Sequence, residues 1–192
     1  MSFLYGAQKL ELDKTLEEQN ITPPLKNKIV VNDVFNLIGA GGPLIDFVDV
    51  SNGNTRKLVI SHNAPRWREI GKGLNIFGIC QNPKCDSWKK EVVYKTKLND
   101  KLVFILNDEI LNIICPICLK IIKVKTCGFY KCEYQFEGKM IKEGELKNYD
   151  SKAKETHGND FEYFDAFENG EIQWKELTIY VLPKQGIKYK IN

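Results

Sequence analysis

Histidine is nearly absent from this chain of 192 residues, which contains only His62 and His157. A RING finger needs two complete sets of metal ligands, and six cysteines without a nearby histidine do not supply them. We expect His62 to end a strand and His157 to be solvated in a polar loop. No grouping of Cys, His and Asp at a spacing useful for nucleophilic catalysis is visible, so we predict a non-catalytic protein.

Long apolar runs are also missing, and none approaches the roughly 20 residues that a membrane helix needs. The N-terminal stretch MSFLYGAQKLELDKTLEEQN lacks the positive region and apolar core of a secretion signal. We therefore expect a cytoplasmic or nuclear protein without a membrane partner. Reducing compartments keep thiols free, so paired cysteines there favour metal binding over disulfides.

The composition, with 43% hydrophobic and 28% charged residues, is typical of a globular protein. The net charge of +3 is too small to indicate a dedicated nucleic-acid-binding protein. The charge is unevenly spread, however: residues 84–131 hold ten lysines and five acidic residues, whereas 133–176 hold six lysines and twelve acidic residues. This pattern indicates solvated faces of opposite sign.

The proline pair in TPP at residues 22–24 predicts a boundary, because proline ends helices. Before it, leucines among charged residues at 9–20 predict a short helix or a loosely attached arm. We therefore divide the chain into an N-terminal arm, 1–24, and a single β-rich zinc-binding domain, 25–192. The cysteine module within that domain spans residues 74–141.

The predicted domain is mostly β. Two pairs of strands are expected as hairpins, one around Asn52-Gly53 and the other around Asn99-Asp100. Alternation of apolar and polar residues predicts further strands at 121–126, 132–138 and 172–182. The glycines at 39–42 lack the lysine of a phosphate-binding loop and predict a turn. We expect a loop at the polar residues 142–160 and a basic tail at 186–192.

Four of the six cysteines form two short turns, CQNPKC and CPIC. Structural zinc takes four ligands in a tetrahedron, and thiolates complete the set without leaving a position for chemistry. The residues between the turns, 86–114, are numerous enough for two strands that place the turns side by side, as in a zinc ribbon. This predicts a Zn²⁺ site with the ligands Cys80, Cys85, Cys115 and Cys118.

The remaining pair, Cys127 and Cys132, has three possible roles. If residues 119–126 are extended, they carry the chain roughly 25 Å away from the metal, and the pair then flanks a GFYK turn at the far end of a hairpin. Alternatively, both cysteines form a compact local site with Cys115 and Cys118, which requires a sharp bend at 120–126. Otherwise they are buried free thiols that pack as small apolar groups.

The function that this pattern favours is a zinc-stabilised protein-interaction module or structural subunit of a larger assembly. The aromatic residues of FEYFDAF, at 161–167, are expected to form core or to anchor a protein partner. One alternative is a nucleic-acid-binding zinc ribbon that contacts phosphates through Lys89, Lys90, Lys95, Lys97, Lys123, Lys125 and Lys131. Another is a component of the ubiquitin pathway, or an enzyme that uses the thiol of Cys127 or Cys132.

From Gly41 onward the chain resembles a family of zinc-ribbon-like proteins with paired cysteines, abundant in ciliates and found in some other protists. The matching segments are FVDV, APRWREIGKGLNIFGICQNPKC, CPIC, TCGFYKCEYQFEGK and WKELTIYV. They cover about three quarters of the domain. The resemblance implies a β-rich zinc-binding domain, sometimes found beside ubiquitin-like domains, and no particular reaction. It places all six cysteines within the shared segments, and it implies a packing role for Trp88.

Overall fold

The computed structural model describes residues 3–5, 8–10, 29–31, 44–61 and 63–184, which fall into two compact units, 1–43 and 44–192. In the first unit, β1 (Phe3–Tyr5) pairs antiparallel with both β2 (Gln8–Leu10) and β3 (Ile29–Val31). Residues 9 and 10 of the predicted arm thus belong to a strand. The predicted boundary at residue 24, the glycines at 39–42 and the tail at 186–192 lie outside the described residues.

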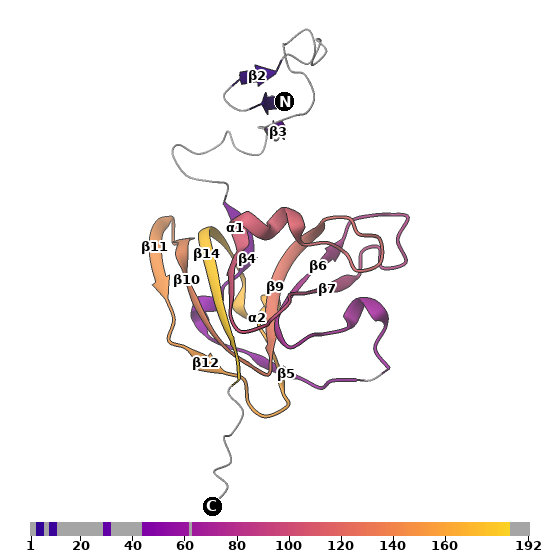
Figure 1. Cartoon of the computed structure of the whole chain (residues 1–192). Helices are drawn as coiled ribbons and strands as arrows, with labels where there is room; N and C mark the ends of the chain where they lie inside the picture. Colours follow the sequence, from indigo (N-terminus) through magenta and orange to yellow (C-terminus); the bar gives the residue numbers. More distant parts are fainter. Residues whose placement is uncertain (1–2, 6–7, 11–28, 32–43, 62, 185–192) are drawn as a thin grey trace, which may run out of the picture. The chain divides into compact units, whose positions relative to one another are not determined.

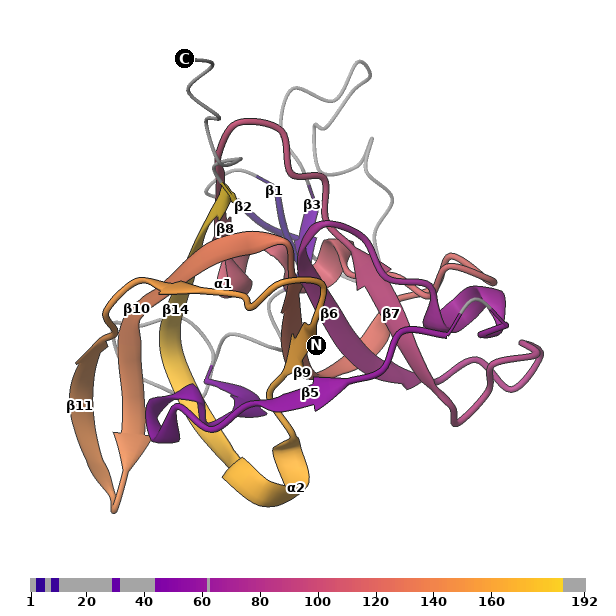
Figure 2. The same cartoon turned by 90° about the horizontal axis from the view of Figure 1, so that it is seen from below.

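The second unit consists of two antiparallel sheets, seen from two directions in Figures 1 and 2. The first sheet has the strand order β11-β10-β14-β4, with β12 paired to β10 and β8 paired to β14. Its strands are β4 (Ile45–Val48), β8 (Leu102–Ile105), β10 (Cys132–Lys142), β11 (Glu145–Asp150), β12 (Lys154–Glu155) and β14 (Glu171–Pro183).

The second sheet has the strand order β5-β13-β9-β6-β7. Its strands are β5 (Arg56–Leu58), β6 (Gly73–Cys80), β7 (Glu91–Lys95), β9 (Ile122–Tyr130) and β13 (Phe161–Tyr163). The described helices are one-turn segments: α1 (Leu106–Glu109), α2 (Ala166–Asn169) and the 3-10 turns Val50–Asn52, Arg66–Arg68 and Ile110–Asn112. The prediction of a mostly β fold is confirmed.

The main core lies between the two sheets. The Phe129 ring of β9 stacks on the Tyr134 ring of β10 at 3.9 Å between centroids, and Phe136 and Phe164 contact both rings edge-on. Trp174 is fully buried and donates its indole N–H to the Val48 carbonyl at 3.2 Å. The inward-facing side chains of β10 are those that its alternating sequence predicts, Cys132, Tyr134 and Phe136.

The predicted strands are present, but three predicted hairpins are wrong. β4 pairs with β14 whereas β5 pairs with β13, so the turn ending at Gly53 connects two sheets. β7 pairs with β6 in the second sheet, whereas β8 pairs with β14 in the first sheet. The chain around Asn99-Asp100 therefore also connects the two sheets. β9 has β6 and β13 on its two edges, which leaves no edge for β10, and the chain crosses between the sheets at Lys131.

The first part of the polar stretch 142–160, predicted as a loop, instead forms a hairpin between β10 and β11, whereas residues 151–153 and 156–160 belong to no strand. Glu143 and Gly144 both have positive φ and make the tight turn, as two-residue hairpin turns require. The side chains of β11 are mostly exposed because it is an edge strand of its sheet. Its inner face is only partly covered, through Lys147 and Tyr149, which explains why its sequence lacks the strict alternation of a half-buried strand.

A bulge in β9 sets the register of the second sheet. Phe77 pairs with Thr126 and Gly78 with Val124, so Lys125 has no partner on β6. The extra residue shifts the alternation, and residues 122, 124, 127 and 129 all join the main core. A Cβ atom on Gly78 would lie 2.6 Å from the Lys123 carbonyl oxygen, so only glycine permits this approach.

Candidate metal centre

The register of β6 and β9 brings the two cysteine turns together. Cys80, the last residue of β6, pairs with Ile122, the first residue of β9. The strands are antiparallel neighbours, as Figure 2 shows, so the loop that leaves β6 and the loop that enters β9 lie at the same end of the sheet. Residues 86–114 contain β7 and β8, in agreement with the two strands predicted there.

Backbone hydrogen bonds close the first turn, which joins β6 to β7. The Cys80 N–H donates to the Lys90 carbonyl at 3.2 Å, and the Lys89 N–H donates to the Cys80 carbonyl at 2.9 Å. Within the turn, the Cys85 N–H donates to the Asn82 carbonyl at 3.0 Å. These bonds hold both cysteines of the pair in one compact loop.

The second turn is a tighter loop. The Cys115 N–H donates to the Lys120 carbonyl at 2.8 Å, the Leu119 N–H donates to the Cys115 carbonyl at 2.9 Å, and Ile114 forms an antiparallel bridge with Ile121. Leu119 has φ of 57°, a left-handed conformation that costs a bulky residue free energy. Leu119 is 67% exposed, so burial of its side chain offsets little of the free energy that the left-handed backbone costs.

Four sulfurs meet between the turns. Cys80 Sγ lies 3.8 Å from Cys118 Sγ, Cys85 Sγ lies 3.9 Å from Cys115 Sγ, and all four sulfurs lie within 4.8 Å of one another. Four sulfurs in a tetrahedron at the Zn–S distance of about 2.3 Å would be separated by about 3.8 Å. The chemistry and spacing of this cluster therefore fit a metal ion, and the cluster can hold one.

The surroundings of the sulfurs act in opposite directions on the pKa values of Cys118 and Cys80. Ser87 Oγ lies 3.1 Å from Cys85 Sγ and 3.2 Å from Cys115 Sγ, and the Ile117 N–H points to Cys115 Sγ at 3.5 Å. Burial acts to raise the pKa of Cys118, but hydrogen bonds, first of all from the Lys120 backbone, lower it to about 6. Burial raises the pKa of Cys80 to about 11. A bound cation would compensate for the burial of these thiolates.

Cys127 and Cys132 are separate from this cluster. Cys127 pairs with Ile76, four residues before Cys80, which places it roughly 13 Å along the strand from the sulfurs. This is shorter than the expected 25 Å, because residues 119–121 belong to the turn. The structure thus brings Cys115 and Cys118 together with the upstream pair, in contrast to the alternative of a local site.

Both separate cysteines are completely buried free thiols. Burial raises the pKa of Cys127 well above its ordinary range and that of Cys132 to about 12. A thiol with such a pKa is protonated at neutral pH and is a weak nucleophile. These environments match the third role considered above, that of small apolar groups in the core.

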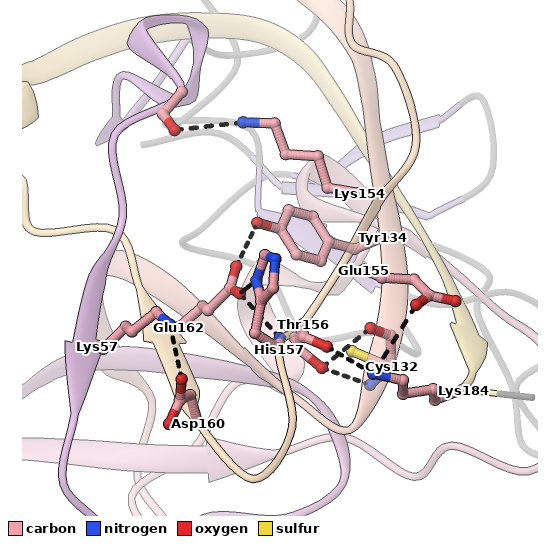
Figure 3. Close-up of polar contacts among 11 residues, drawn as sticks. Lys57, Cys132, Tyr134, Lys154, Glu155, Thr156, His157, Asp160, Glu162 and Lys184 are labelled. Carbon is pink, nitrogen blue, oxygen red and sulfur yellow. Dashed lines mark hydrogen bonds and ion pairs between the residues drawn. The ribbon is translucent and has the colours of Figure 1, made fainter. Parts of the chain in front are cut away.

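A buried carboxylate forms a second polar cluster, drawn in Figure 3, which sequence reasoning missed. Glu162 Oε2 accepts a hydrogen bond from the Tyr134 hydroxyl at 3.0 Å, and Oε1 accepts from the His157 backbone N–H at 3.2 Å. The His157 ring reaches the same oxygen at 3.1 Å, although its side chain is 78% exposed. Burial, together with the charge of Glu162, raises the pKa of Tyr134. Both oxygens of the buried carboxylate thus have hydrogen-bond partners, which offsets the cost of burying the charge and links β10 to β13.

The aromatic residues of 161–167 divide between core and surface. Phe161 and Phe164 are buried, Tyr163 donates its hydroxyl to Glu91 at 3.1 Å, and Phe167 is 95% exposed. Trp88 is 45% exposed, and the Lys89 ammonium lies 4.6 Å from its ring centroid. His62, the predicted end of a strand, lies outside the described residues.

Comparison with protein families, with curated proteins and with solved structures found no match for the chain. The resemblance to the protist family therefore stays a prediction. No helix in the described part of the chain has the length and apolar character needed to cross a membrane.

Proposed function

We propose that Cys80, Cys85, Cys115 and Cys118 bind one Zn²⁺ and that the chain is a non-catalytic protein-interaction module or structural subunit of a larger assembly. The observation that carries this proposal is the closed set of four sulfurs. Four thiolates fill the tetrahedral shell that zinc prefers, and a filled shell leaves no position for a substrate or an activated water. The metal then serves the fold, in a protein of the cytoplasm or nucleus.

The position of the cluster supports a structural role. The ion would tie the ends of β6 and β9 to a connection of 29 residues, 86–114, whose ordering is entropically costly. It would also hold Leu119 and Trp88 on the surface beside the metal. Exposed apolar side chains on a rigid scaffold are typical of contacts with protein partners.

The lysines considered for nucleic-acid binding do not form one unpaired set. Lys95 and Lys125 form ion pairs with Glu69 and Glu171. The ammonium groups of three others lie over aromatic rings, those of Lys89, Lys90 and Lys131. Lys95 and Lys125 are thus neutralised within the protein, which interrupts a continuous phosphate-binding surface, whereas the three lysines over aromatic rings keep their positive charge.

The test is recovery of the tagged full-length chain from its own cells after cross-linking, with the metal and the attached proteins analysed together. We expect the native chain and Cys127→Ala to retain zinc and the same protein partners, whereas Cys85→Ala loses both. Recovery of nucleic acid whose attachment falls steeply with salt, or partners that survive the loss of zinc, would contradict the proposal.

A further inference from the structure

A hollow lies beside the residues that follow edge strand β5 of the second sheet, on the face of that sheet away from the main core. It has a volume of about 770 Å³, and the apolar part of its lining includes Leu58, Val59, Ile60, Trp67, Phe77 and Phe161. A smaller hollow of about 460 Å³ lies on the other side of the same segment, between Leu58–Ile60 and residues 130–131 and 159–160. The segment 58–60 therefore borders open space on two sides.

The backbone of this segment is available for pairing. Among the described strands, β5 is an edge strand that pairs with β13 alone, and the pairing ends at Leu58 opposite Phe161. Beyond that residue, the backbone groups of Val59 and Ile60 make no hydrogen bond with the described part of the chain. Their side chains are 97% and 37% exposed. An unpaired edge that presents β-branched apolar residues is a template for another strand.

The charges around the two hollows indicate the sign of a ligand. Each carboxylate in the lining has a partner: Asp160 pairs with Lys57 at 2.7 Å (Figure 3), Glu91 with Arg68 at 3.3 Å, and Glu69 with Lys95 at 3.0 Å.

Two lysines of the lining have no carboxylate partner among the described residues. The ammonium of Lys90 lies 4.5 Å from the Trp67 ring centroid, and that of Lys131 lies 5.1 Å from the Tyr130 ring centroid. Because every acidic group of the lining is paired, the uncompensated charge at this surface is positive. It is complementary to acidic residues on a ligand.

We propose that an extended acidic segment of a partner protein adds as a strand to the edge formed by residues 56–60. Its backbone pairs with the free edge of β5 and with Val59 and Ile60. One of its large apolar side chains enters the hollow against Trp67, Phe77 and Phe161, and its carboxylates meet Lys90 and Lys131. Backbone pairing supplies affinity in this mode of recognition, and the side-chain hollow supplies specificity.

This inference rests on the proposed function, since it names the surface and the partner class of the interaction module. A protein segment fits better than a nucleic acid because aliphatic side chains and an unpaired backbone edge dominate the surface. Two aromatic rings of the lining have a cation over them, Trp67 under Lys90 and Tyr130 under Lys131, and both rings are partly buried. Base stacking depends on freely accessible aromatic faces.

The experiment begins with a random library of twelve-residue peptides displayed on phage and selected against the zinc-loaded full-length chain. We expect enrichment of sequences in which acidic and large apolar residues alternate. The strongest of these peptides is then titrated into ¹⁵N-labelled protein, where the amide signals of residues 56–60 and of Trp67 should shift. N-methylation of alternate peptide nitrogens should weaken binding at least tenfold, because it removes the strand pairing.

Matched variants separate this surface from the rest of the molecule. Val59→Lys should weaken the peptide about tenfold, whereas Val103→Lys, at an exposed valine of edge strand β8, should leave the affinity unchanged. Lys90→Glu should also weaken it about tenfold, in contrast to Lys152→Glu at an exposed position. The Val59 side chain is almost fully exposed, so its replacement leaves folding intact.

Three outcomes would overturn the inference: no enriched peptide, an enriched peptide whose signals map elsewhere, or oligo-dT of fifteen nucleotides shifting the same amides in competition with the peptide. A peptide that maps to another surface leaves the interaction module standing and removes only this edge. Loss of the proposed function itself would appear separately, as a folded chain without zinc or without any protein partner in its cells.

Discussion

Replacement of Gly78 by alanine tests how the fold positions the cluster of four cysteines. Gly78 faces the bulge of β9, two residues before Cys80. Its Cβ atom would lie 2.6 Å from the Lys123 carbonyl oxygen and 2.9 Å from Ile122 Cδ1. Ordinary contact begins at 3.4 Å, so the strands would have to separate by up to 0.8 Å. The carbonyl belongs to the backbone and cannot rotate away as a side chain would.

The expected loss of stability follows from two opposing effects. Overpacking of this kind costs about 3 kcal/mol, the upper part of its usual range, because backbone must move. The lower entropy of the unfolded alanine chain offsets about 0.7 kcal/mol. We therefore expect Gly78→Ala to lower the free energy of unfolding by about 2 kcal/mol. The displaced strand end should also weaken zinc binding about tenfold, since Cys80 moves relative to Cys115 and Cys118.

Urea unfolding and competition with a chromogenic zinc chelator measure the two effects. Gly71→Ala is the matched control, because its Cβ would meet only the Lys95 side chain at 3.6 Å, an ordinary contact. The control should be as stable as the native chain or slightly more stable. If Gly78→Ala matches the control in both stability and zinc affinity, the close approach of β6 and β9 is not what aligns the cysteine turns.

Three further predictions concern metal and core. Removal of zinc with a strong chelator should lower the urea midpoint of unfolding, because the fold loosens at the end of β6, and should make the thiols of the four clustered cysteines reactive. Unchanged unfolding curves would refute the structural role of the metal. Phe129→Ala should lower the free energy of unfolding by about 4 kcal/mol, because it removes a fully buried ring stacked on Tyr134. The exposed control Phe167→Ala should change it by less than about 0.5 kcal/mol, and equal effects of the two variants in urea unfolding would contradict the packing. Burial raises the pKa of Cys132 to about 12 from an ordinary 9.0, so the unfolded chain releases this proton first and stability falls as pH rises above 9. Cys132 should account for about 1 kcal/mol of that loss between pH 9 and 10, and urea unfolding of Cys132→Ala should show a correspondingly smaller decline than the native chain.

Local patterns made much of this structure predictable. The spacing of the cysteines indicated which four sulfurs meet, because short turns hold two ligands each and the intervening residues are numerous enough to return the chain to the same place. The alternation in β9 and β10 predicted Ile122, Val124, Tyr134 and Phe136 as core, and all four are buried. Such patterns depend on neighbours in sequence, and the backbone period of a strand is enough to interpret them.

Strand pairing was not predictable from the same patterns. A glycine or asparagine turn indicates a reversal of the chain, but the sheet that a strand joins depends on partners far away in sequence. Asn52-Gly53 thus makes a turn between two sheets, and β5 pairs with β13 about a hundred residues later. The bulge at Lys125 also escaped detection, because it arises where Gly78 of β6 allows a close approach, and its effect on Cys127 appears only once the register is known.

X-ray absorption at the zinc edge, combined with metal analysis of the purified full-length chain, tests the central claim most directly. The account predicts one zinc per chain with four sulfur neighbours at about 2.3 Å. A folded chain that holds no metal, a second zinc ion, or a shell with nitrogen or oxygen ligands would contradict it.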